Sequence, residues 1–553
     1  MSLRRRTLLA GALAGALAAC QRQSPPPAWT GGWIGANAER GHRLRDMASA
    51  AIPAPAAQHR AGVVVVGGGI AGLAAARALA ASGIDDVQLL ELEDNAGGNS
   101  RGHLLGNIAC PLGAHYLPVP GEHAVEVIEL LDQLGLRRIE HGQAVYDERH
   151  LCHSPQERIF IAGHWHDGLL PPLDALPNEQ RADTQAQYRR FAAAVDRASG
   201  AGAFTMPTAR SAWSAELAAL DAVTFASWLD AQGLVAPALR WYLDYCCRDD
   251  YGAGAAQVSA WAGLHYFASR HGFHAPGDGS DERDGVLTWP EGNAWLSRQL
   301  ATPLGRRIHI GSVVLRVDED RHEVRVDTWN THTRQVERWS AAQVVLATPL
   351  FVSARLLAQA NEALTQVVST MRHAPWLVGN LQLRDALDDR PGAAPSWDNV
   401  LYEAGPAGAM LGYVDAMHQS TRPYPGPTVL TSYWALGGDD ATQLSANRAR
   451  LLADPWQVWA GKVVDDLARA HPDLPDKLER IDLMRYGHAM SVPAPGLRSS
   501  AALRALAQPQ RRVHFAHSDL SAYSVFEEAM YHGTRAAAQI RTASVRAPLK
   551  PAG

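Results

Sequence analysis

Three glycines near the start of the chain have the spacing of a phosphate-binding turn. They form a Gly-x-Gly-x-x-Gly pattern, made of Gly67, Gly69 and Gly72 around Ile70 and Ala71. The first glycine permits a tight turn, the second lets the backbone approach a pyrophosphate, and the third lets a helix pack closely on a strand. The N-terminus of a following helix presents N–H groups and partial positive charge to phosphates. The pattern therefore predicts that these five residues bind a dinucleotide.

A carboxylate further along the chain is placed to bind the ribose of the same dinucleotide. Glu91 follows the largely apolar stretch 87–90, which reads as the second strand. An acid at the end of the second strand accepts hydrogen bonds from ribose hydroxyls and disfavours a 2′-phosphate. We therefore expect Glu91 to bind a ribose that carries no such phosphate.

The local pattern also predicts the elements that must hold these residues. The β-branched run 63–66 is typical of a strand buried on both faces, and the stretch 73–81 favours a helix. Ser82 and Gly83 end this helix before the second strand, 87–91. The glycine turn thus follows a strand and opens a helix, which is the context that a dinucleotide site requires.

The rest of the chain predicts a cofactor domain built from separated segments. Helical spacing of apolar residues dominates the middle of the chain, and strand patterns return in three later segments. We therefore assign residues 61–120, 285–350 and 485–545 to the cofactor domain. The intervening residues 121–284 and 351–484 are expected to form a substrate-binding domain.

The N-terminus indicates an export signal rather than a membrane anchor. Arginines at 4–6 precede a short apolar stretch that ends in small residues before Cys20. The start resembles a twin-arginine signal, and the residues before Cys20 resemble a bacterial lipobox. We expect residues 1–19 to be a signal peptide, residues 20–60 to be a tether, and a lipid on Cys20 to be the only membrane contact. The expected location is periplasmic, anchored to the bacterial envelope.

Composition and charge exclude several classes of function. The 553 residues are 47% hydrophobic, which suits a large globular core. With 51 basic and 56 acidic residues the net charge is −5, without the basic excess of a nucleic-acid-binding protein. No apolar run reaches the roughly 20 residues that span a bilayer. No zinc-type cysteine pattern occurs, so we expect no metal site. Because the charge shows no basic excess, we also expect no nucleic-acid partner.

The segment after Glu91 resembles the equivalent segment of glutathione-reductase-like flavoproteins. Those proteins carry a second glycine pair shortly after the ribose acid. Here that pair is Gly97 and Gly98, and Arg101 follows. The resemblance implies FAD as the cofactor, with these three residues along its pyrophosphate.

Later segments resemble flavin-containing amine oxidases. The stretch 111–116 is similar to the segment that passes near the flavin in that family, which implies contacts from Gly113, Ala114 and His115. Val314 lies where members of the family contact adenine through the backbone.

The last match is the stretch 515–519, which resembles the C-terminal flavin segment of the same family. Members usually carry glycine followed by an acid there, whereas this chain has His517 and Ser518 before Asp519. The resemblance implies that Asp519 takes the role of the acid toward the ribityl chain, from a shifted position.

The resemblance implies an α/β fold, with a discontinuous, glutathione-reductase-like FAD-binding Rossmann domain and an interleaved, largely helical substrate domain. It also implies an exported FAD-dependent oxidoreductase that oxidises a small-molecule amine at CH–NH by hydride transfer to the flavin. The electrons would pass to O2, or to a quinone or another envelope carrier. Two alternatives remain open: carotenoid-desaturase-like C–C dehydrogenation, and a non-enzymatic flavin-binding envelope lipoprotein.

The first catalytic candidate is a histidine in place of a lysine that many relatives hold near the flavin. Many amine oxidases hold a lysine near the flavin, but this chain has none between Pro349 and Lys462. His373 is therefore our candidate replacement. His488 is placed to approach the ring, and Tyr523 to lie on the substrate side of the flavin.

One candidate comes from a polar-aromatic cluster in the expected substrate domain. Asp249, or its neighbour Asp250, is placed to attract a cationic substrate. A structural ion pair between Arg248 and an aspartate at the end of a helix is the alternative.

Overall fold

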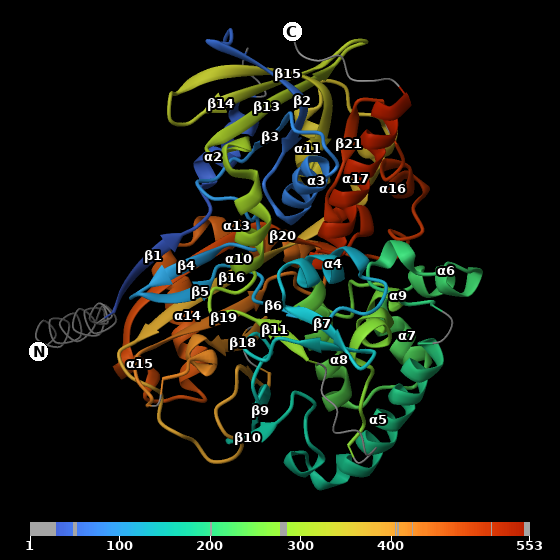
Figure 1. Ribbon diagram of the computed structural model, residues 1–553. Helices are drawn as coiled ribbons and strands as arrows, with labels where there is room; N and C mark the ends of the chain where they lie inside the picture. Colours follow the sequence, from blue (N-terminus) through green and yellow to red (C-terminus); the bar gives the residue numbers. More distant parts are fainter. Residues whose placement is uncertain are drawn as a thin grey trace, which may run out of the picture.

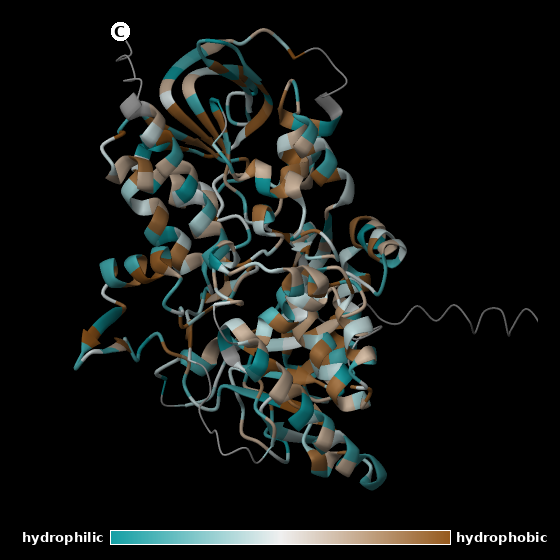
Figure 2. Ribbon diagram, turned by 90° about the vertical axis from the view of Figure 1, so that its right-hand side faces the viewer, coloured by the Kyte–Doolittle hydropathy of each residue, from teal (hydrophilic) through white to brown (hydrophobic). Residues whose placement is uncertain are grey.

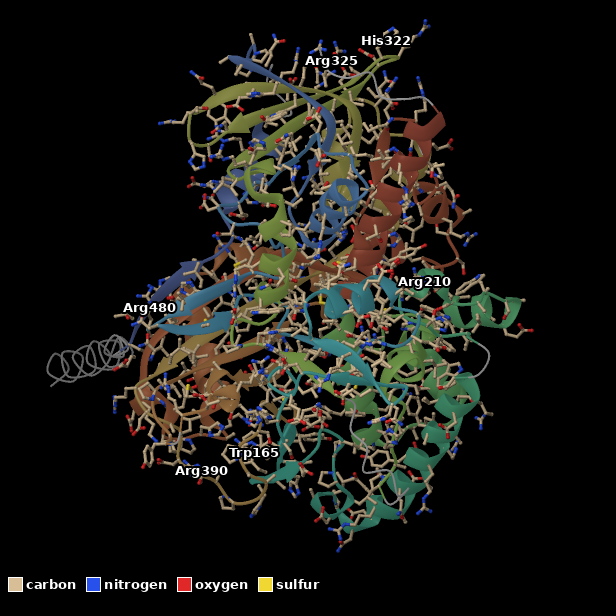
Figure 3. The ribbon with its side chains drawn as sticks, viewed as in Figure 1. Trp165, Arg210, His322, Arg325, Arg390 and Arg480 are labelled. Atoms are coloured by element: carbon tan, nitrogen blue, oxygen red, sulfur yellow. The ribbon has the colours of Figure 1, made fainter. Side chains whose placement is uncertain are left out.

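Two β-sheets organise the molecule, a seven-stranded sheet in the upper half of Figure 1 and an eight-stranded sheet in the lower half. Figure 3 labels His322 and Arg325 beside the first sheet, and Trp165 and Arg480 on the second. The computed structural model describes residues 29–47, 52–199, 202–276, 285–403, 405, 409–422, 424–509 and 511–546.

The seven-stranded sheet is built around the predicted βαβ unit. Strand β2 (Ala57–Val66) pairs in parallel with β3 (Val87–Leu90) and with β15 (Gln335–Leu346), and helix α3 (Ile70–Ala81) connects β2 to β3. The remaining strands are β12 (Ile308–His309), β13 (Ser312–Glu319), β14 (Val324–Asn330) and β21 (Val513–Phe515). The expected α/β fold is confirmed.

Helices cover both faces of this sheet, which is why β2 ends in four consecutive apolar residues. Val63 and Val65 pack on the side of α3 and α17 (Phe526–Arg546). Val64 and Val66 pack on the other side, where the covering helices are α11 (Leu350–Leu356), α12 (Glu362–Thr370) and α16 (Ala501–Leu506). In Figure 2 the helices alternate between hydrophobic and hydrophilic positions, as expected for helices with one face toward a core.

The expected substrate domain contains the eight-stranded sheet. Its order is β1 (Thr30–Ile34), β20 (Leu478–Val492), β16 (Arg372–Leu383), β19 (Thr428–Ala435), β18 (Met410–Asp415), β17 (Asp398–Leu401), β9 (Glu157–Ile161) and β10 (His164–Asp167). Strand β19 is buried along its whole length, so its apolar residues do not alternate and periodicity alone does not identify it. Strand β20 continues past residue 485, where the sequence predicts that the last segment of the cofactor domain begins.

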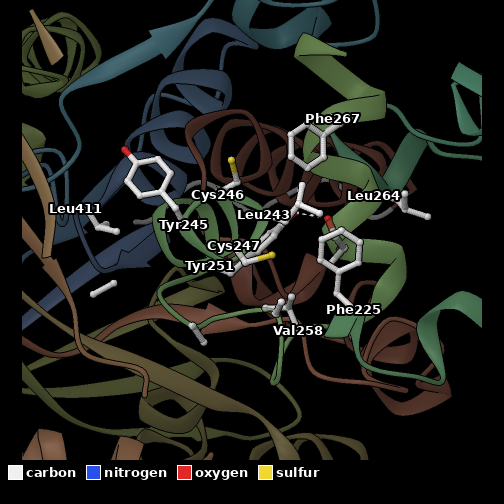
Figure 4. Close-up of a cluster of buried hydrophobic side chains, with 14 of the residues drawn as sticks. Phe225, Leu243, Tyr245, Cys246, Cys247, Tyr251, Val258, Leu264, Phe267 and Leu411 are labelled. Carbon is white, nitrogen blue, oxygen red and sulfur yellow. Dashed lines mark hydrogen bonds between the residues drawn. The ribbon is translucent and has the colours of Figure 1, made fainter. Parts of the chain in front are cut away.

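The helical part of the same domain lies beside this sheet. Its helices are α5 (Asn178–Ala198), α6 (Ala215–Asp221), α7 (Phe225–Ala231), α8 (Pro237–Tyr251) and α9 (Ala260–Tyr266). Figure 4 shows their packed interior, where Leu243 and Tyr251 of α8 lie with Phe225 and Phe267. Helix α8 ends where Gly252 takes a left-handed conformation, with φ of +70°.

Further elements connect these bodies. They are α4 (Val125–Gln133), α10 (Ala294–Ala301), α13 (Ala441–Ala453), α14 (Trp456–Ala468), α15 (Leu474–Lys477) and the paired strands β4 (Gly102–Leu105) with β5 (Ile108–Pro111), β6 (Tyr116–Pro118) with β11 (Val286–Thr288), and β7 (Arg137–Glu140) with β8 (Gln143–Tyr146). Within the described ranges, no helix is long and apolar enough to cross a membrane.

The tether expected over residues 20–60 is wrong for its described part. Strand β1 pairs in parallel with β20, and helix α2 (Ala38–Met47) packs beside β13. Trp29 and Trp33 explain this order, because both pack against the core of the eight-stranded sheet. The prediction gave weight to proline and polar residues and overlooked these two apolar anchors. The expected signal peptide and Cys20 lie outside the described residues.

Candidate active site

One large cavity lies between the two sheets. Its volume is about 840 Å³, and its lining joins the glycine turn at one end to residues of α8 and β19 at the other. Most of the predicted site residues line it, namely Gly67, Gly69, Ile70, Ala71, Glu91, Gly97, Gly98, Gly113, Ala114, His115, Asp249, Val314, His373 and His488. Their contact with a cofactor remains a prediction.

The glycine turn presents bare backbone to the cavity. Gly67 has φ of +101°, and a Cβ atom there would lie 2.8 Å from the carbonyl oxygen of Ala347. The α-carbon of Gly98 lies 3.9 Å from the position of a Cβ on Gly69, so two glycines face each other at the cavity wall. Gly72 underlies the turn, because its Cβ would meet the carbonyl oxygen of Gly67. This cradle, which side chains would fill, fits the diphosphate of a dinucleotide.

Glu91 lies at the cavity and also holds the turn. One carboxylate oxygen accepts a hydrogen bond from the Gly68 N–H at 2.7 Å, and the other accepts one from the Glu93 N–H at 2.8 Å. Burial raises the pKa of Glu91. The residue therefore braces the backbone around the site in addition to its predicted role toward a ribose.

Arg101 binds the backbone behind the second glycine pair. It does not line the cavity; its Nε donates to the carbonyl oxygen of Gly98 at 3.0 Å, and its Nη1 donates to that of Gly35 at 3.4 Å. The expectation that Arg101 lies along the pyrophosphate remains a prediction. Its guanidinium is engaged by two carbonyl groups behind the second glycine pair.

Aromatic side chains wall the segment expected beside the flavin. The Tyr433 hydroxyl donates to the Gly113 carbonyl oxygen at 3.1 Å, and the Tyr486 hydroxyl donates to the Leu112 carbonyl oxygen at 2.8 Å. The His115 ring stacks on Tyr433 with centroids 4.3 Å apart, and burial lowers the pKa of His115 to about 3. His115 is therefore neutral.

Trp376 and Tyr433 line the cavity near the end of α8. Their ring centroids are 6.4 Å apart, at an angle of 69°. A Cβ on Gly252 would lie 2.6 Å from Nε1 of Trp376, which places this indole against the end of α8. The sequence did not single out either aromatic residue, because each belongs to a strand more than 100 residues from α8 and no local motif marks it.

Asp249 is the predicted residue with the clearest functional placement. Tyr116 hydrogen-bonds its carboxyl group, and burial followed by the charge of Asp250 raises the pKa of Asp249 to about 7. The alternative of a structural ion pair is found for Arg248, but its partners are Asp244 at 2.5 Å and Asp439 at 2.9 Å rather than Asp249.

A buried charge network adjoins Asp249. Arg270 lies 3.7 Å from a carboxylate oxygen of Asp250 and 3.3 Å from one of Glu527, and all three residues line the cavity. The Tyr523 hydroxyl donates to Asp250, but Tyr523 is buried behind the wall and does not line the cavity. Its hydroxyl points to Asp250, and its predicted place on the substrate side of the flavin remains a prediction.

Unused hydrogen-bonding capacity remains at this wall. Within the described part of the chain, Nε of Arg270, Nε1 of Trp376 and Oδ1 of Asn293 are buried without a hydrogen-bond partner, and these three residues line the cavity. Buried polar atoms are rarely left unpaired. The wall is therefore suited to a polar ligand.

Asp519 lies behind the cavity rather than in it. Its carboxylate accepts a hydrogen bond from the Leu350 N–H at 2.9 Å, and both of its oxygens lie 3.0 Å from Nε2 of His373. Burial opposes ionisation, but His373 and His517 outweigh it and hold the pKa of Asp519 well below its usual range. Asp519 therefore holds His373 in place, and its expected contact with a ribityl chain remains a prediction.

The two histidine candidates line a part of the cavity rich in positive charge. Desolvation and the charges of Arg448 and His373 lower the pKa of His488. The ring of Phe351 contacts both, with centroid distances of 4.7 Å to His488 and 5.1 Å to His373, and the two imidazole rings lie 6.3 Å apart. Within the described residues no lysine lines this cavity: Lys462 lies over the Trp459 ring and Lys477 pairs with Asp388.

Known proteins share both the sequence pattern and the fold. A family model described as flavin containing amine oxidoreductase matches residues 70–541. A double mutant of putrescine oxidase is similar in structure, with a TM-score of 0.63, 17% identity, and 88% of this chain and 100% of that chain covered. Cyclohexylamine oxidase from Brevibacterium oxydans IH-35A gives a TM-score of 0.62 and 20% identity, with 88% and 100% covered. The CLA-producing fatty acid isomerase from P. acnes gives 0.60 and 16%, with 88% and 99% covered.

Proposed function

The chain belongs to the flavin-containing amine oxidoreductase family, as an oxidoreductase with FAD as its cofactor, and we propose that it oxidises a small-molecule amine held near Asp249. The observation that carries this proposal is the cavity-lining carboxylate of Asp249, which has no ion pair among the described residues; the charge of Arg270 acts on it less than burial and Asp250 do. Asp249 has Tyr116 as its hydrogen-bonding partner. A carboxylate in such surroundings gains most from a cationic ligand.

The charges around Asp249 support a cation rather than an anion. The cavity lining at this end contains three carboxyl groups, from Asp249, Asp250 and Glu527, and one guanidinium, from Arg270. With all groups ionised, the charge there is negative. Since buried charges are weakly screened, an ammonium group offsets this excess, whereas a carboxylate or phosphate adds to it.

The aromatic side chains of the cavity also favour a cationic ligand. Tyr433 and Trp376 line the cavity, and aromatic ring faces attract cations. The hydrogen bond from Tyr433 to Gly113 fixes one ring, so a substrate finds a preformed wall.

The bound FAD supplies the acceptor for the two electrons and the hydrogen of the substrate C–H bond. The protein must orient the amine and take up the proton of its ammonium group, because only a neutral amine gives up hydride readily. Asp249, with a pKa of about 7, is placed to accept that proton at neutral pH. Tyr116 holds the carboxyl group in position.

The amine proposal has a direct test that separates it from C–C dehydrogenation. The holoenzyme is mixed without oxygen with monoamines, polyamines, amino acids and long apolar polyenes, and the loss of the oxidised flavin absorbance is followed. We expect bleaching by a member of the amine group. Bleaching by the polyenes alone would overturn the proposal. Failure of every compound to bleach a flavin that dithionite does reduce would count against it equally.

We further propose that the protein works outside the cytoplasm, tied to the envelope by a lipid on Cys20. The sequence of residues 1–20 supports this proposal. The chain from Gln21 to Thr30, where β1 begins, spans at most about 36 Å if fully extended. The folded body would then stay close to the membrane surface, where a quinone or another envelope carrier is available as an alternative acceptor to O2.

A further inference from the structure

The segment from residue 34 to residue 47 crosses from one sheet of the molecule to the other. In Figure 1 it runs from β1, on the edge of the eight-stranded sheet, up to α2 beside the seven-stranded sheet. Seven of its residues, between 36 and 45, line the same cavity as the glycine turn. The segment precedes residue 70, where the family match begins.

Hydrogen bonds tie this segment to the loop that follows Glu91. The N–H of Asn37 donates to a carboxylate oxygen of Glu93 at 3.0 Å. Nη1 of Arg40 donates to Asp94 at 2.7 Å and to the Leu92 carbonyl oxygen at 3.3 Å. The segment therefore lies beside the residue that we expect to bind ribose.

Packing holds the helix at the same place. Leu44 is buried in one hydrophobic cluster with Leu90 and Val314, the residues that flank the nucleotide end of the cavity. Arg43 lies over the ring of Trp329, 4.7 Å from its centroid. Helix α2 is thus a docked part of the nucleotide domain.

The segment also adds basic side chains to the cavity, which Arg355 and Arg448 line as well. His42 and Arg45 line the cavity from α2, and the charge of His42 acts on His488 together with those of Arg355 and Arg448. The diphosphate of FAD carries two negative charges, and the glycine turn opposes them only with N–H groups and a helix terminus. Charged hydrogen bonds from a side chain are stronger than neutral ones.

We infer that residues 36–45 form the outer wall of the FAD site and retain the bound cofactor, with His42 and Arg45 facing its phosphates or ribose. This wall rests on FAD as the cofactor and is independent of the substrate. FAD leaves the cavity only when these residues move or lose their contacts. The wall slows the release of FAD and adds contacts that the glycine turn alone does not provide.

The release of FAD from the full-length holoprotein tests this inference. Purified protein is diluted into buffer that contains an excess of a flavin-scavenging apoprotein, and the flavin that stays on the re-isolated protein is measured over time to give the rate. We expect the double variant His42→Ala with Arg45→Ala to release FAD roughly tenfold faster or more. Alanine is the best helix former, so these changes do not weaken α2 itself.

Two further variants keep the experiment decisive. Glu39→Ala is the matched control, because Glu39 is exposed on α2 and does not line the cavity. Arg40→Ala removes the contacts with Asp94 and Leu92 without touching the cavity, and we expect a smaller acceleration. If the double variant does not fold, Arg40→Ala decides the question alone. Release at the parent rate, or equal acceleration by Glu39→Ala, overturns the inference.

Discussion

The Tyr433 hydroxyl donates a hydrogen bond to the carbonyl oxygen of Gly113 at 3.1 Å. This bond joins an aromatic wall of the substrate end, on β19, to the segment expected beside the flavin. A neutral hydrogen bond of this kind contributes about 1 kcal/mol. The cofactor segment and the substrate wall are therefore mechanically connected.

Tyr433→Phe removes this bond and keeps the ring. We expect kcat/KM for the best amine to fall about three- to tenfold, because the ring is less firmly held against the substrate. Steady-state kinetics and the flavin absorption spectrum measure the effect. Tyr424→Phe is the control, since Tyr424 is 79% exposed. Equal kinetics in the two variants would contradict the role of Tyr433.

Asp249→Asn tests the anchor for the amine. Because Asp249 has a raised pKa of about 7, its carboxylate form grows as the pH rises through 7 and is lost below it. We expect kcat/KM of the parent to rise through this range. In Asp249→Asn we expect this rise of kcat/KM with pH to disappear. We also expect kcat/KM to fall at least about 100-fold, which is the size of the effect of losing a buried charge contact. Asp196→Asn, an exposed change on α5, is the control. A parent-like pH profile in Asp249→Asn would refute the assignment.

Asp519→Asn tests the buried pair with His373. The folded-state pKa of Asp519 lies below its unfolded value, so the pair contributes stability above about pH 4 and loses it as the pH falls further. We expect the free energy of unfolding at pH 7 to fall by about 3 kcal/mol. Urea unfolding at several pH values checks this, with Asp85→Asn as an exposed control. A loss of stability that stays constant down to pH 3 would argue against the pair.

Glu91→Ala is expected to weaken the retention of FAD. It removes bonds to the N–H groups of Gly68 and Glu93, each worth roughly 1.5–3 kcal/mol, in addition to any bond to ribose. The ratio of flavin to protein after purification measures the loss. Glu91→Gln keeps the acceptor oxygen and the size of the side chain, so it separates bracing from charge. Full occupancy in Glu91→Ala would contradict this account of the site.

Replacement of Arg5 and Arg6 by lysine tests the export route. The twin-arginine route carries folded proteins, so we expect a precursor loaded with FAD to accumulate in the cytoplasm. Fractionation of cells, with flavin fluorescence of the purified precursor, measures this. Normal export of the double variant would show that a different route is used.

The sequence alone determined the nucleotide half of the site. The glycine turn, the strands on either side of it and Glu91 lie within about thirty residues, and their conformations depend on local sterics and periodicity. Helix α3 therefore begins at Ile70, directly after the turn. The resemblance to a flavoprotein family was visible for the same reason, because its motifs are short and contiguous.

Only the tertiary structure decided the substrate half and the outer wall. Asp249, Trp376 and Tyr433 come from an α-helix and two strands that are far apart in the chain, and their meeting depends on how the eight-stranded sheet packs on the helices. The motif predicts Asp519 at the cofactor, but only the fold shows that its buried carboxylate pairs with His373. A long-range contact has no periodic signature, so only the folded chain shows which charges share a buried space.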